Sequence, residues 1–96
     1  MNIQLSKFGT TLLSRPLGKE AWAAFSSSLK EIKENELIQL DFDGVVTFSP
    51  SWGDEFLTPL IARFGDRLIL RQTTNPSVKE TLELLEKIHK IKFRFA

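Results

Sequence analysis

The segment from residue 37 to residue 55 constrains the fold of this chain more than any other. Residues 37–42 are mostly apolar, as in a buried central strand, and Asp43-Gly44 follows as a turn signal. A short β-branched run, residues 45–48, leads into the polar loop Ser49-Pro50-Ser51, which opens a helix. A strand that leads so directly into a helix predicts an α/β fold, and the loop between them is the first place to look for function.

Hydrophobic periodicity predicts that strands and helices alternate along the rest of the chain. Gly9 separates two short extended runs, which predict an N-terminal hairpin. The other expected elements are helices over 17–34, 51–64 and from Asn75-Pro76 onward, and strands over 67–71 and 91–95. We expect Pro59 to kink the second helix, and the strictly alternating last strand to form an edge. The predicted architecture is a single α/β domain over residues 1–96, with a central mixed sheet and helices packed mainly on one face.

Composition excludes several classes of function. The chain has 96 residues, 13 basic against 12 acidic side chains, no cysteine and one histidine. Near-neutral charge gives little attraction to phosphate backbones, so we expect no nucleic-acid partner. The lack of cysteine excludes disulfides and thiolate sites, and one histidine cannot build a multi-histidine metal site, so we expect no metal and no cofactor. No apolar run approaches the roughly 18 residues of a membrane span and no signal peptide is visible, which predicts a cytoplasmic protein with no membrane partner.

The loop and the helix start after it hold the main candidate residues for binding. Ser51, with Asp54 three residues later, is typical of a helix N-cap followed by an acidic residue. Asp54 and Glu55 are expected to complement the helix dipole from the first turn, and Trp52 to be partly exposed beside the loop. Adjacent helical side chains point about 100° apart, so we expect the two carboxylates not to converge on one atom and not to act as a catalytic pair. The candidate site residues for a partner or a phosphate are Ser49, Ser51, Trp52, Asp54 and Glu55.

A second candidate site is Ser14-Arg15, which precedes the first helix. A guanidinium beside helical N–H groups can bind an anion, and this is one interpretation. The other is a helix cap, with Arg15 lying along the sheet edge or pairing with Asp41 or Asp43. Asp41 and Asp43 lie two residues apart and are expected to face the same side of a strand, but two carboxylates alone are a weak signal for Mg²⁺.

Several motifs together resemble those of the STAS family, the fold of anti-sigma factor antagonists. Residues 40–45 (LDFDGV) are similar to the family's strand and turn, and the loop that opens the helix follows them as it does there. The whole chain is most similar to compact STAS-like domains of unassigned function, through three motifs. These motifs are Ser14-Arg15, residues 49–55 (SPSWGDE) and Asn75-Pro76. The resemblance implies a STAS-like fold and regulatory binding to a protein.

The chain departs from the antagonists at their phosphorylation site. In that family, the serine after the loop aspartate is phosphorylated by a histidine-kinase-like ATPase partner. The aspartate position here is Ser49, the serine position is Pro50, and Ser51 aligns with the following serine. The resemblance therefore assigns no phosphoacceptor, and leaves Ser49 and Ser51 as candidates.

We therefore expect a non-enzymatic regulatory module that resembles an anti-sigma factor antagonist. It would dock a protein partner, such as a histidine-kinase-like ATPase or another anti-sigma-type regulator, through the Ser49–Ser51 loop and the following helix. Two alternatives stay open. One is a small ligand- or nucleotide-binding domain or enzyme that uses Arg15 with Asp41 or Asp43. The other is a structural oligomerisation domain that pairs through the C-terminal strand.

Overall fold

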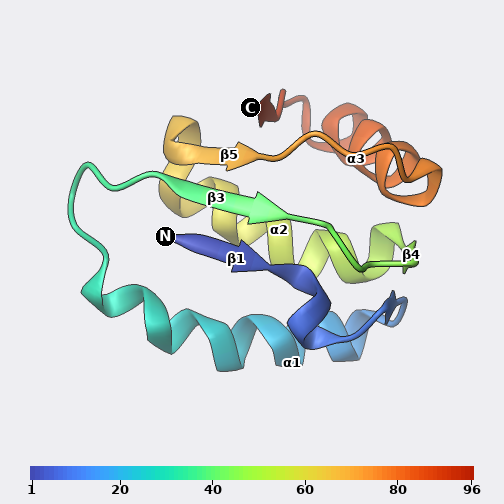
Figure 1. The fold of residues 1–96 in the computed structure, drawn as a ribbon, viewed down its shortest axis with the longest axis horizontal. Coiled ribbons are helices and arrows are strands. Elements are labelled where there is room, and N and C mark those ends of the chain that lie inside the picture. Colours follow the sequence, from blue (N-terminus) through green and yellow to red (C-terminus); the bar gives the residue numbers. More distant parts are fainter.

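A parallel four-stranded sheet with three α-helices forms the domain (Figure 1). The computed structural model describes all 96 residues. The strands are β1 (Asn2–Gln4), β2 (Thr11–Leu12), β3 (Ile38–Asp41), β4 (Thr47–Phe48), β5 (Leu68–Leu70) and β6 (Arg94–Phe95). The helices are α1 (Arg15–Ser26), α2 (Pro50–Phe64) and α3 (Pro76–His89), with the 3₁₀ turns η1 (Leu5–Phe8), η2 (Ser27–Glu31) and η3 (Gly65–Arg67).

In the main sheet, two strands that are connected by a helix are also neighbours. The order is β1-β3-β5-β6, and every pairing is parallel. When each right-handed crossover steps the same way across a sheet, all helices are placed on the same face. Figure 1 agrees, since α2 lies behind β1, β3 and β5 and no helix crosses in front of them. The expected α/β domain is confirmed, with a parallel sheet in place of the mixed one.

The predicted N-terminal hairpin is wrong. β1 pairs with β3, while β2 pairs in parallel with β4 as a separate two-stranded arm. The turn η1 and Gly9, whose φ is 129°, carry the chain away from β1 before β2 begins. Phe8, at the end of that turn, packs against the rings of Trp52 and Phe56, which fixes this direction.

The first helix is shorter than its hydrophobic periodicity predicts. It ends at Ser26, and the chain continues as the 3₁₀ turn η2 to Glu31. The Ser26 and Ser27 hydroxyls donate to the carbonyls of Ala23 and Ala24, and such bonds compete with the α-helical pattern. Pro59 lies inside the second helix, which is a single element and not two short helices; it ends at Phe64, with Gly65 as its cap.

The core lies between the sheet and the helices, and α2 runs through its centre. Six residues of α2 are buried: Trp52, Gly53, Phe56, Leu57, Leu60 and Phe64. Trp52 is 2% exposed and stacks on Phe56 with ring centroids 5.2 Å apart. The expectation that Trp52 is partly exposed is therefore wrong; Trp22, against the edge of Phe56, is the half-buried tryptophan.

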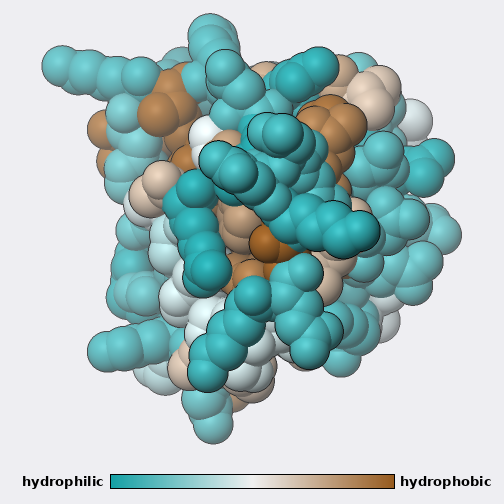
Figure 2. Space-filling view, turned by 90° about the vertical axis from the view of Figure 1, so that its left-hand side faces the viewer, coloured by the Kyte–Doolittle hydropathy of each residue, from teal (hydrophilic) through white to brown (hydrophobic).

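The end of the molecule where the strands begin is mostly hydrophilic (Figure 2). Hydrogen bonds and an ion pair hold the segments at this end together. The Met1 ammonium donates to the Leu37 carbonyl at 2.8 Å and lies 3.1 Å from the Glu36 carboxylate, while Arg67 donates to the carbonyl of Lys33. None of the helices has the length and apolar content that crossing a membrane requires. The candidate residues lie at the opposite end, where α2 begins.

Candidate functional site

Ser49, two residues before the predicted position, caps α2. Its Oγ accepts the N–H of Trp52 at 3.2 Å and donates to the Leu13 carbonyl at 2.5 Å. Pro50 occupies the first helical position, where its fixed φ and missing N–H are tolerated, and this places Ser51 inside the helix. Asp54 consequently lies in the second turn of the helix. The prediction that Asp54 and Glu55 complement the helix dipole from the first turn is therefore also wrong.

The amino end of α1 packs directly on the amino end of α2. A Cβ on Gly18 would lie 2.7 Å from the backbone oxygen of Trp52, so only glycine allows the two helices to approach this closely. Ser14 caps α1, because its Oγ accepts the Leu17 N–H at 3.2 Å, as one of the sequence interpretations expects. The two capped helix ends, with Ser14-Arg15 and Ser49–Ser51, thus form one site.

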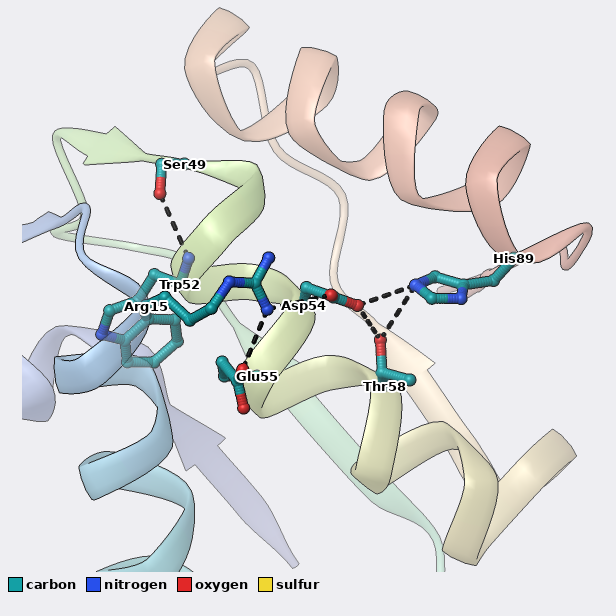
Figure 3. Close-up of polar contacts among 7 residues, drawn as sticks. All are labelled: Arg15, Ser49, Trp52, Asp54, Glu55, Thr58 and His89. Atoms are coloured by element: carbon teal, nitrogen blue, oxygen red, sulfur yellow. Dashed lines mark hydrogen bonds and ion pairs between the residues drawn. The ribbon is translucent and has the colours of Figure 1, made fainter.

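A polar bridge connects the three helices beside this site (Figure 3). We define it as Arg15 of α1, Asp54, Glu55 and Thr58 of α2, and His89 of α3. Arg15 Nη1 lies 3.2 Å from Asp54 Oδ2 and 2.9 Å from Glu55 Oε1. Asp54 Oδ1 accepts the Thr58 hydroxyl at 2.7 Å and lies 2.7 Å from His89 Nε2.

Two sequence predictions about these side chains are wrong. Asp54 and Glu55 do converge on one atom, because Arg15 approaches between them and its Nη1 contacts both carboxylates. Arg15 consequently does not pair with Asp41 or Asp43. Asp41 ends β3 and its Oδ1 accepts the N–H of Asp43 at 2.9 Å, while Asp43 lies beyond the strand in an exposed turn.

The electrostatics of the polar bridge favour its charged form. Partial burial alone would raise the pKa of Asp54, but hydrogen bonds from Thr58, His89 and Arg15 outweigh burial, so that its pKa is lowered. The hydrogen bonds to Glu55 and Asp54 raise the pKa of Arg15 above its already high ordinary value. Both Asp54 and Arg15 are therefore charged over the whole neutral range.

The geometry of the polar bridge is unlike a nucleophile relay. A relay needs the hydroxyl on one imidazole nitrogen and the carboxylate on the other. Here Thr58 Oγ1 and Asp54 Oδ1 both face His89 Nε2, at 3.3 Å and 2.7 Å. The two Asp54 oxygens accept from Arg15 and from Thr58, so the carboxylate is engaged in holding the helices together. The chain has no group of three or more histidine, cysteine, aspartate or glutamate residues placed to hold a metal ion.

The five predicted site residues have four different environments. Trp52 is core, and Asp54 and Glu55 belong to the polar bridge. Ser49 is half-buried, with its hydroxyl engaged in both directions. Ser51 is half-buried at the second helical position. Its hydroxyl takes no part in the side-chain hydrogen bonds of this region, which makes it the free hydroxyl at the amino end of α2.

Sequence reasoning missed two members of the polar bridge. Thr58 lies four residues after Asp54, a helical spacing that predicts a contact between the two side chains. His89 lies 35 residues from Asp54, and only the packing of α3 on α2 brings them together. No sequence signal could have found His89.

Comparisons with known proteins assign no family to the chain. A scan against protein-family models, a search of curated proteins and a search of solved structures each returned no match.

Proposed function

We propose that this domain is a non-enzymatic regulatory module, similar to STAS-type anti-sigma factor antagonists, that binds a protein partner at the amino end of α2. The partner class is a histidine-kinase-like ATPase or another anti-sigma-type regulator. The observation that carries the proposal is the free hydroxyl of Ser51 at a helix start that exposed apolar side chains flank on one side.

Exposed leucines flank that helix start on the side of α1. Leu13 is 46% exposed, and its carbonyl accepts a hydrogen bond from the Ser49 hydroxyl. Leu17 is 58% exposed and precedes Gly18, the residue in contact with the Trp52 carbonyl. Apolar side chains beside a polar helix start offer a partner both buried area and hydrogen-bond partners. We define the docking surface as Leu13, Leu17, Ser51 and the outer side of Glu55. The sequence predicted that the whole of helix α2 binds the partner, but the apolar face of α2 is buried in the core.

Phosphate on Ser51 would change this surface through Arg15. Ser51 and Glu55 are one helical turn apart, a spacing at which side chains are neighbours. A phosphate there would repel Glu55 and Asp54 and compete with both for the guanidinium of Arg15. It would thereby loosen the contact of α1 with α2 at the place where the partner docks. This gives Ser51, rather than the capping Ser49, the role of regulatory phosphoacceptor.

Affinity capture from lysate of the source cells tests the docking surface. The bait is the whole domain, with and without ATP, and the retained proteins are quantified by mass spectrometry. We expect an ATPase of the histidine-kinase-like class on the unmodified domain. The variants Ser51→Asp and Leu17→Ser should each retain it about tenfold less, the effect of losing an interface contact worth about 1–2 kcal/mol.

Leu84→Ser is the matched control, since Leu84 is an exposed leucine on α3, 41% accessible and outside the docking surface. It should retain the partner as the unmodified domain does. Equal retention of the ATPase by folded Ser51→Asp and Leu17→Ser would contradict the proposal, as would the absence of any such ATPase.

A further inference from the structure

The face of the sheet that carries no helix is polar in the half formed by β1 and β3. Along β1, Ile3 is buried and its neighbours Asn2 and Gln4 are exposed. Along β3, Ile38 and Leu40 point into the core and Gln39 and Asp41 face the other way, as their burial alternates. The register places Asn2 beside Gln39 and Gln4 beside Asp41.

A hollow of about 90 Å³ lies on this face. Its lining is entirely polar: Asn2, Gln4, Gln39, Asp41 and Arg71. Of the five, only Asp41 uses its side chain within the chain, accepting the Asp43 N–H with Oδ1. Three amides, a guanidinium and one carboxylate oxygen are therefore free to bind something else.

The two charges of the hollow lie at the ends of neighbouring strands but are not paired. Leu40 of β3 is in register with Leu70 of β5, so Asp41 and Arg71 follow at the same level, and the Arg71 N–H donates to the Leu40 carbonyl at 2.9 Å. The ion pairs of the chain lie elsewhere, at Glu36 and within the polar bridge. A positive and a negative group thus flank a polar hollow, and each lacks a counter-charge within salt-bridge distance.

We propose that this hollow binds a small zwitterion of the α-amino acid class. The ligand carboxylate would take the fork of Arg71, which matches carboxylate geometry, and the ammonium would take the free oxygen of Asp41. The amides of Asn2, Gln4 and Gln39 would complete the hydrogen bonds. The volume corresponds to about three water molecules, enough for the ammonium, the α-carbon and the carboxylate. The ligand side chain would project into solvent, so the site would select for the two charged groups and not for the side chain.

This site is separate from the docking surface at the amino end of α2, and it does not depend on the proposed partner. Its residues belong to β1 and β3 and to the residue after β5, whereas the docking surface belongs to α1, α2 and the segment before them. Either proposal can fail while the other holds.

Titration of the ¹⁵N-labelled domain with glycine tests the site through the side-chain amide signals of Asn2, Gln4 and Gln39. We expect saturable shifts of these signals. Glycinamide, which lacks the carboxylate, and N-acetylglycine, which lacks the ammonium, should each bind about tenfold more weakly or worse, because each leaves one charge of the hollow unpaired.

Arg71→Gln and Asp41→Asn should abolish the saturable shifts. The asparagine introduced by the second substitution can still accept the backbone N–H that Asp41 accepts, so the turn to Asp43 is kept. Arg63→Gln is the control, because Arg63 is an exposed arginine on α2, away from the hollow. Signal dispersion reports that each variant is folded. The proposal is overturned by an absence of saturable shifts with glycine, by equal binding of the three ligands, or by undiminished binding to folded Arg71→Gln.

Discussion

Asp54 is the residue at which the three helices meet. One carboxylate oxygen faces Arg15 of α1, and the other faces Thr58 of its own helix and His89 of α3. Its side chain is 28% exposed, so each contact is partly screened by water and contributes modestly. Together these contacts fix how α1 and α3 are oriented on α2. Packing of apolar faces alone would fix that orientation less specifically.

Replacement of Asp54 by asparagine should remove an acid-sensitive part of the stability. The pKa of Asp54 is lowered on folding, so its contribution is fully present above the unfolded pKa of about 3.9 and is lost as the pH falls through the folded pKa. We expect Asp54→Asn to lower the free energy of unfolding by roughly 1–2 kcal/mol at neutral pH. The difference from the unmodified domain should shrink to near zero in strong acid. Urea unfolding at a series of pH values measures it.

Asp43→Asn serves as the control for that series, because Asp43 is exposed and makes no ion pair. It should follow the unmodified domain at every pH. A constant difference between the Asp54→Asn variant and the unmodified domain down to strong acid would show that Asp54 acts by packing and not by charge.

At the residue scale, local spacing made part of the site predictable. The contact of Thr58 with Asp54 follows from helical spacing, and Ser14 as the cap of α1 follows from its residue type. The partners of Arg15 did not follow, because they depend on how closely α1 approaches α2. That approach is set by Gly18 against the Trp52 carbonyl, a contact that only the folded chain reveals.

At the scale of elements, the start of α2 shows how one proline moves a helix boundary. The sequence prediction treated Ser51 as the cap, although Pro50 is best placed at the first helical position, directly after a cap. The same rule correctly predicts Asn75 before Pro76 as the cap of α3, where the Asn75 side chain accepts the N–H groups of Ser77 and Val78. Applied to Ser49-Pro50, it would have found Ser49.

The two serines at this helix start should differ in their effect on stability. Ser49→Ala removes both the cap of α2 and the bond to the Leu13 carbonyl, and we expect it to cost about 1–2 kcal/mol. Ser51→Ala should change the free energy of unfolding by no more than about 0.5 kcal/mol, because its hydroxyl makes no such bonds. Chemical denaturation of both variants measures the contrast. Equal losses for the two would refute the division of the serines into a structural and a regulatory one.

At the scale of the whole molecule, the order of elements was predictable and the strand pairing was not. Apolar runs and helix signals place β3, α2, β5 and α3 close to their observed bounds. The direction of β1 and β2 depends on Phe8 joining the aromatic cluster with Trp52 and Phe56, a long-range contact without a local signal. Because β1 joins β3 in parallel, the sheet is wholly parallel and one of its faces stays without helices.

That architecture gives the domain three separate surfaces: the proposed docking surface at the start of α2, the helix-free sheet face and the outer side of α3. We expect a protein partner to cover the first of them. Amide hydrogen exchange of the whole domain, free and bound to its captured partner, locates the covered surface. We expect partner-induced protection to concentrate in residues 13–18 and 49–55. Protection confined to the sheet face or to α3, with unchanged exchange at the start of α2, would contradict it.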